Sequence, residues 1–153
     1  MNNNFLLKSA GKSKLPINLS VGASKFQEIN KSFKVLKKYR NKVNLLYGLQ
    51  NFPTRIDDVN LEKLKFLKDR FNLNIGYQDH CEGNSPEGLH IPILSLGYGV
   101  KILEKHICLN RKKNGFDYQS ALKPVEFSNF VKKIRLAEKS IGQKFSNKFS
   151  RSE

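Results

Sequence analysis

Four short apolar segments, each followed by a stretch with helical periodicity, constrain the fold of this 153-residue chain. Alternating βα units indicate a parallel sheet with its helices outside. A complete (βα)8 barrel takes about 250 residues, so four units make half of one. A small, open, doubly wound sheet is the alternative. The expected strands span residues 15–20, 43–48, 73–77 and 100–106, and the helices about 25–40, 61–71, 92–96 and 124–141.

The boundaries follow from periodicity and from residues that start or end helices. Apolar side chains recur at the helical period between residues 26 and 36. The short third helix is expected to have Pro92 in its first turn, after a polar, Gly-rich loop over 82–88. A segment before the first strand could be the end of a helix that stops at Gly11. We expect one domain over residues 1–142 and a polar tail over 143–153.

Charge is the strongest signal in the composition. The chain has 28 Lys and Arg against 13 Asp and Glu, a net charge of +15. Clustered basic groups can bind nucleic acid by releasing counterions from phosphates. These basic residues are instead dispersed, and no Cys/His finger or RRM-type aromatic motif accompanies them. Nucleic acid is therefore a disfavoured partner, and a substrate with phosphate or carboxylate explains some of the charge equally well.

Composition also bears on the compartment. With 39% hydrophobic residues, 11 Phe and 5 Tyr, the chain can form a core, which excludes a fully disordered protein. No apolar run approaches the roughly 20 residues of a membrane span, and the start lacks the apolar region of a signal peptide. Cys81 and Cys108 are too few for a disulfide framework. We expect a reduced, cytoplasmic protein with no membrane partner.

Polar residues stand at or just after the carboxyl ends of the expected strands, where both candidate folds bind ligands. They are Ser20, Gln50, Gln78, Asp79, His80, Glu104, Lys105 and His106. Neighbouring strands lie about 4.8 Å apart, so His80 and His106 could converge on one ion and leave positions for water and substrate. Alternatively, each histidine is an ordinary polar residue at the rim. Cys81 and Cys108 are expected to be buried, inert thiols.

The order of several motifs resembles the sialic acid synthase family, the N-acetylneuraminate synthases and their relatives. The motifs are Gly76-Tyr77-Gln78-Asp79-His80, Ile102-Leu103-Glu104-Lys105-His106, Gly115-Phe116-Asp117 with Ser120-Ala121-Leu122, and Pro124 opening the last helix. Residues 15–22 also resemble the family's PIILSTG strand, and residues 52–59 its YPTP…EDV loop. DH, EKH and GxD in this order are specific, and the resemblance covers about residues 5–142.

The resemblance implies a (βα)8 TIM barrel followed by a small antifreeze-like domain, and this chain matches the barrel from its fifth strand onward. Family members condense phosphoenolpyruvate with an N-acylated amino sugar. A divalent metal, usually manganese, would be held by His80 and His106. Glu104 and Asp117 would contact the sugar as catalytic carboxylates. The expected substrate-binding residues are Ser20, Gln50, Phe52 and Gln78.

The chain departs from the family pattern at several positions. Gln78 stands where the family has Ser, and Gln50 and Phe52 stand where Asn and Tyr are usual. The segment between the two histidines is longer than usual, with residues 82–88 as the expected insertion. These changes predict a divergent branch that uses a different sugar. The first four strands of the family barrel, with their phosphate-binding lysine, have no counterpart in the chain.

Three functional interpretations remain open: a half-barrel synthase that works when completed by the missing half, a non-catalytic remnant, and a module that binds an anionic partner. In a half-barrel, the strand edges near residues 15–19 and 100–107 lack neighbours. Inner-facing residues, with Leu45 and Ile102 as candidates, would lose the side chains opposite them. We therefore expect a complementary half-barrel chain, a homodimer or aggregation rather than a stable monomer.

Overall fold

The computed structural model describes residues 3–111 and 115–142, so the expected tail lies outside the described part of the chain. The elements are α1 (Asn4–Lys12), β1 (Ile17–Ser20), α2 (Phe26–Leu36), η1 (Lys37–Lys42), β2 (Val43–Tyr47), η2 (Ile56–Asp58), α3 (Glu62–Phe71), β3 (Ile75–Asp79), α4 (Glu87–Gly97), β4 (Ile102–Lys105), η3 (Tyr118–Ser120) and α5 (Pro124–Ile141). Within the described ranges, no helix combines the length and apolar character that a membrane crossing requires.

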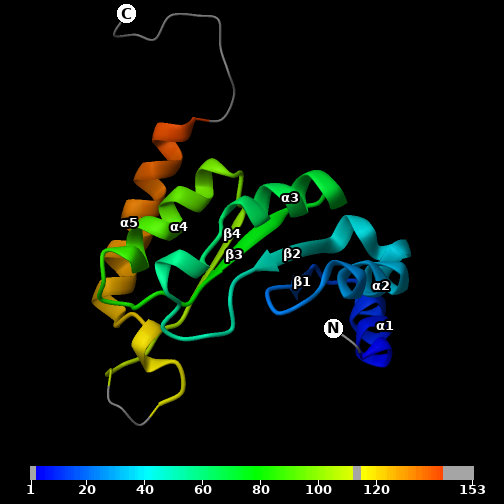
Figure 1. The fold of residues 1–153 in the computed structure, drawn as a ribbon, viewed down its shortest axis with the longest axis horizontal. Helices are drawn as coiled ribbons and strands as arrows, with labels where there is room; N and C mark the ends of the chain where they lie inside the picture. The colour runs from blue at the N-terminus through cyan, green and yellow to red at the C-terminus, as the bar shows by residue number, and fades with distance from the viewer. Residues whose placement is uncertain (1–2, 112–114, 143–153) are drawn as a thin grey trace, which may run out of the picture.

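The four strands form one parallel sheet whose spatial order equals their order in the chain (Figure 1). Successive right-handed crossovers in one direction place the connecting helices on the same face of a sheet. Residues of α2, α3 and α4 accordingly share one core with the strands. A doubly wound sheet needs helices on both faces. The predicted half-barrel is therefore confirmed, and the doubly wound alternative is wrong.

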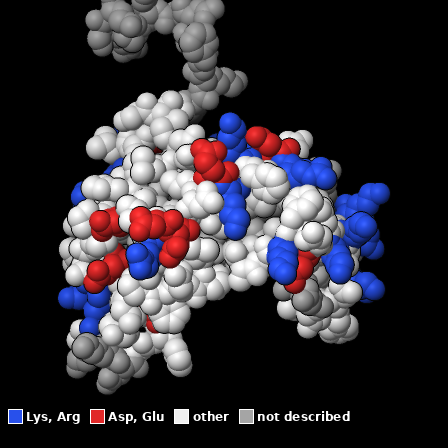
Figure 2. Space-filling view, viewed as in Figure 1, with Lys and Arg blue, Asp and Glu red and all other residues white. Residues whose placement is uncertain are grey.

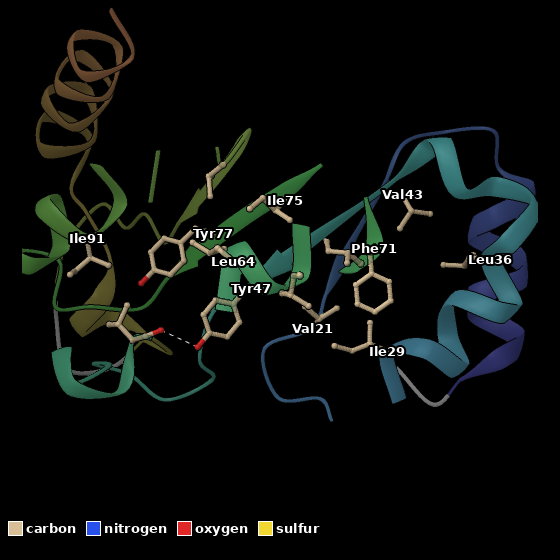
Figure 3. Packing of buried hydrophobic residues seen from close by; sticks show 14 of the residues in the cluster. Val21, Ile29, Leu36, Val43, Tyr47, Leu64, Phe71, Ile75, Tyr77 and Ile91 are labelled. Carbon is tan, nitrogen blue, oxygen red and sulfur yellow. Dashed lines mark hydrogen bonds between the residues drawn. The ribbon is translucent and has the colours of Figure 1, made fainter. Parts of the chain in front are cut away.

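The main core lies between the sheet and these helices. Alternate strand residues point into it, because successive side chains of a strand face opposite sides. Figure 3 shows Tyr47 beside Leu64, with its hydroxyl donating to the carbonyl of Val59 at 3.0 Å. Leu45 is fully buried in this same core, so its expected place on the inner face is wrong. Leu46, the next residue, takes the opposite face.

The inner face, which is the side of the sheet turned away from this core, carries polar groups near the amino ends of the strands. Nδ2 of Asn44 donates to Oδ1 of Asn18 at 2.9 Å, and Nδ2 of Asn74 donates to Oδ1 of Asn44 at 3.2 Å. We call these three residues the asparagine ladder. The branched, apolar side chains that usually fill a closed barrel are thus replaced here by a row of amides.

The third helix begins earlier than expected. α4 starts at Glu87, so Pro92 lies inside the helix, and its expected place in the first turn is wrong. Proline there removes the hydrogen bond to the carbonyl of Gly88. The side chain of Pro92 is fully buried, and this removal of apolar surface from water offsets the lost bond. Burial therefore outweighs the local signal that proline gives in the sequence.

Two further boundaries differ from the expected ones. α1 continues through Gly11, where a Cβ would lie 2.4 Å from the ring of Tyr39. Glycine is thus needed there for close packing and not to end the helix. β3 lies two residues further along than the expected 73–77, because Gln78 and Asp79 are buried within it and have polar partners there. β1 and β4 are each shorter than expected.

The close approach of Gly48 to β3 can be tested by adding one methyl group. A Cβ at Gly48 would stand 2.1 Å from the carbonyl oxygen of Gln78, so we expect Gly48→Ala to lower the free energy of unfolding by about 1–3 kcal/mol. Gly97 ends α4, and a Cβ added there would have nothing within 4 Å, so Gly97→Ala should change stability little. Urea unfolding followed by circular dichroism compares the two, and equal losses would contradict the close approach.

Candidate functional site

A chain of hydrogen bonds crosses the inner face at the carboxyl ends of the strands. Oγ of Ser20 donates to Oε1 of Gln78 at 2.8 Å, and Nε2 of Gln78 donates to Oε1 of Glu104 at 2.8 Å. Gly48, which directly follows β2, has no side chain to interrupt this chain of bonds and lies against Gln78. The structure therefore brings together three of the residues that the sequence singled out, from β1, β3 and β4.

The two strand-end histidines lie side by side. His80 follows β3 and His106 follows β4, with ring centroids 4.9 Å apart and planes inclined by 55°. Together with Asp79, Glu104 and Lys105 they line a cavity of about 160 Å³. The carbonyl oxygen of His80 accepts hydrogen bonds from the backbone N–H of Thr54 at 2.8 Å and from Oγ of Ser120 at 2.6 Å. The loop that contains Thr54 and the end of η3 thus fix the backbone of His80.

His80 has the electronic state that a metal ligand requires. Its Nδ1 is buried without a hydrogen-bond partner among the described residues. Burial, and then the neighbouring His106, lower the pKa of His80, although nearby carboxylates oppose the shift. This lowered pKa favours the neutral ring, and a neutral imidazole offers a lone pair to a cation.

Asp117 lies beside the second histidine. Its Oδ2 is 3.5 Å from Nε2 of His106, an arrangement in which a carboxylate can orient an imidazole whose other nitrogen binds a metal. Asp117 has a φ of 56°, in the left-handed region that aspartate tolerates better than most residues. The turn before η3 thus directs this carboxylate towards the histidine pair.

The histidine pair by itself is an incomplete set of ligands. In residues 3–111 and 115–142, no three His, Cys, Asp or Glu side chains group closely enough to hold a metal ion. The unpartnered nitrogen of His80 and its neutral ring nevertheless fit a cation whose other positions are filled by water, substrate or a further chain segment.

Gln50 and Phe52 are placed apart from this group. Both lie in the loop between β2 and α3 with exposed side chains, 45% exposed for Phe52. The loop is joined to the site through its backbone, since Thr54 donates to His80. Gln50 and Phe52 are therefore at the rim, and neither is part of the hydrogen-bonded chain on the inner face.

Sequence reasoning assigned no role to Asp79 and Lys105, which form a buried ion pair. Each side chain is only 1% exposed, and Oδ2 of Asp79 accepts a hydrogen bond from Nζ of Lys105. Oδ1 of Asp79 accepts from the hydroxyl of Tyr77 at 3.3 Å and from the backbone N–H of Cys81 at 3.2 Å. The signal in the sequence was present: opposite charges at the position directly before each histidine.

The chain is similar to proteins with known names. A family model described as the NeuB family matches residues 1–146. N,N'-diacetyllegionaminic acid synthase of Campylobacter jejuni is 33% identical over 139 residues, which cover 89% of this chain and 40% of that protein. Human N-acetylneuraminate-9-phosphate synthase is 28% identical over 142 residues, which cover 92% and 38%.

Among solved structures, an N-acetylneuraminic acid synthetase from Leptospira borgpetersenii superposes with a TM-score of 0.85 at 29% identity, covering 98% of this chain and 50% of that one. The chain thus spans about two fifths of the length of the curated relatives that it matches.

The two cysteines should differ in reactivity. Burial, and then Asp79, raise the pKa of the Cys81 thiol to about 12. Cys108 is only half-buried, so its expected place as a buried thiol is wrong. Because the thiolate is the reactive form, we expect one thiol to react rapidly with Ellman's reagent at pH 8 and the second to react only on unfolding. Cys108→Ser should abolish the rapid phase and Cys81→Ser should retain it. Two rapid equivalents in the native protein would contradict this assignment.

Proposed function

The chain belongs to the NeuB family, and on that premise we propose that it supplies the metal-binding half of a synthase site that joins phosphoenolpyruvate to an N-acylated amino sugar. The observation that carries the proposal is the convergence of His80 and His106 next to Glu104 and Asp117. The names of its relatives, which are synthases of N,N'-diacetyllegionaminic acid and of N-acetylneuraminate 9-phosphate, support the same class of product.

Each residue of the group has a distinct task in this proposal. A divalent cation bound by the two histidines, with manganese as our candidate, would supply Lewis acidity to the open-chain aldehyde of the sugar. Glu104 and Asp117 would accept hydrogen bonds from sugar hydroxyls and move a proton as the carbonyl is attacked. Ser20, whose hydroxyl proton is donated to Gln78, would line the phosphoenolpyruvate site and offer its oxygen as an acceptor. The enol carbon of phosphoenolpyruvate would attack the aldehyde, water would add to the neighbouring oxocarbenium carbon that still bears the phosphate, and phosphate would then leave.

Gln78 supports a change of sugar within this chemistry. Its amide reaches both Ser20 and Glu104, which a serine at the same position is too short to do. It therefore fixes one oxygen of Glu104 and takes space on the inner face. At the rim, Gln50 offers an amide and Phe52 a ring without a hydroxyl to a sugar that enters the site. We propose that these three residues select the sugar.

The open edge of β4 supports completion by another half-barrel. The segment after β4 pairs with Leu122 through the carbonyl of His106 at 2.8 Å and the N–H of Cys108 at 2.9 Å. Ile102 and Glu104 lie four and two residues before His106, so their backbone N–H and C=O groups face the same edge of β4 as those of His106. Among the described residues, no strand pairs with this edge. A groove of about 420 Å³, lined by both apolar and charged residues, lies beside this edge, against α5. It is lined by residues that include Leu96, Val100, Leu103, Phe127, Phe130 and Ile134.

Charge favours a complementary half over a second copy. Two chains of +15 each would repel one another, whereas a less basic partner would be repelled less and an acidic one attracted. On the face drawn in Figure 2, the Lys and Arg side chains over α3 are mixed with acidic ones and a smaller basic group lies over α2, which gives limited support to a nucleic-acid-binding function. The two free cysteines are consistent with a reducing compartment such as the cytoplasm.

Manganese binding tests the metal site directly. We expect the purified chain to bind Mn²⁺, and His106→Ala to weaken binding at least tenfold, because one of two imidazole ligands is lost. His90 is exposed on α4, so His90→Ala is the matched control and should bind as the wild type does. Isothermal titration calorimetry provides the affinities. Equal affinity in all three proteins would eliminate the site.

Phosphate release tests the reaction. The chain alone should release no phosphate from phosphoenolpyruvate and N-acetylmannosamine, because one half of the barrel provides only some of the groups that the site needs. Mixed with the amino-terminal half-barrel of a family member, it should sediment as a one-to-one complex and release phosphate only when phosphoenolpyruvate and an N-acylated amino sugar are both present.

Two results would count against the proposal. Release by the chain alone would show that no complementary half is needed. A stable complex that is inactive with every N-acylated amino sugar tried would support the remnant interpretation instead.

A further inference from the structure

We infer that the buried ion pair of Asp79 and Lys105 is a positioning device that holds the rings of His80 and His106 side by side. The inference rests on the metal site proposed above, because it gives that site its geometry. Neither charged group has an assigned role in the chemistry, and each immediately precedes one of the histidines.

The register of the sheet places the pair where it can act. Asp79 and Lys105 are direct partners in the parallel ladder and are the last residues of β3 and β4. Their ion pair therefore joins the two strands at the last step before the histidines. A slip or separation of the strand ends that moved the rings would also have to break this ion pair.

The pair also fixes the side to which the chain turns. Gln78 and Glu104 are hydrogen-bonded on the inner face, so the residues that follow them point to the opposite face, towards α4. A Cβ at Gly88 of α4 would lie 3.4 Å from Nζ of Lys105, so the absence of a side chain there leaves room for the ammonium. With the ion pair held under α4, the residue that follows each strand, His80 or His106, is turned back towards the cavity.

Stability alone does not account for this pair. Removing two charges from water is expensive, and apolar residues of similar volume often serve as well or better. Asp79 is instead satisfied by three donors from Lys105, Tyr77 and Cys81. Such directional bonds fix a carboxylate in one orientation, which apolar packing does not do. Outer partners of metal ligands commonly act in this way, and their loss reduces metal affinity about 10–100-fold.

The test removes both charges together. In the full chain, Asp79→Asn combined with Lys105→Met keeps similar volumes and leaves no uncompensated buried charge. We expect a folded protein in which the nuclear Overhauser contact between the rings of His80 and His106, measured without metal, is lost. We also expect a roughly tenfold weaker affinity for Mn²⁺.

The control removes an ion pair elsewhere. Arg135 and Glu138 pair at 2.7 Å on the exposed surface of α5, and Arg135→Met with Glu138→Gln should change neither readout. If the buried double variant does not fold, Tyr77→Phe removes only one donor to Asp79 and should weaken Mn²⁺ binding severalfold with the fold intact.

The outcomes separate the two proposals. An unchanged ring contact and unchanged affinity in a folded double variant, or in Tyr77→Phe, would overturn the positioning role. Absence of Mn²⁺ binding by the wild type would contradict the proposed metal site, whereas loss of the ring contact in the double variant would still support the positioning role.

Discussion

In-register pairing of four parallel strands is the constraint on which the other features of this molecule depend. Because the strands run in one direction, their carboxyl ends meet at a single edge, and Ser20 comes within hydrogen-bond distance of a residue 58 positions later. Glycine permits the close approach of the connecting segments. A Cβ at Gly22 would lie 1.5 Å from the carbonyl oxygen of Gly48, and one at Gly48 would lie 2.1 Å from that of Gln78. The polar edge can assemble only because these positions lack side chains.

The sequence predicts the half-barrel well. Apolar periodicity identifies each strand and helix locally, and the strands lie in the sheet in the same order as in the chain. It predicts individual positions less well where burial decides between alternatives. Pro92 suggests a helix start, yet it lies inside α4 because it is buried there. Leu45 and Leu46 are both apolar neighbours, and only the register determines which of them faces the helices.

The residues of the candidate site also divide into those that the sequence predicts and those that depend on the folded structure. Ser20, Gln78 and the two histidines could be found from their places at strand ends, since parallel strands bring those ends together. Asp79 and Lys105 could not be recognised as an ion pair without knowing the register that sets them opposite one another. Gln50 and Phe52 illustrate the limit for loops, because the path of the chain after β2 is set by contacts such as that of Thr54 with His80.

The asparagine ladder bears on whether this chain could fold before a barrel is closed around it. An inner face that carries Asn18, Asn44 and Asn74 can be hydrated. The concave surface of the isolated half-barrel is therefore not wholly apolar. Its main core is already enclosed between the sheet and helices. If a complementary half completes the barrel as proposed, folding of this half and closure of the barrel would therefore be separate steps. In the closed barrel the amides would retain trapped water, and that end of the interior would be hydrated rather than dry.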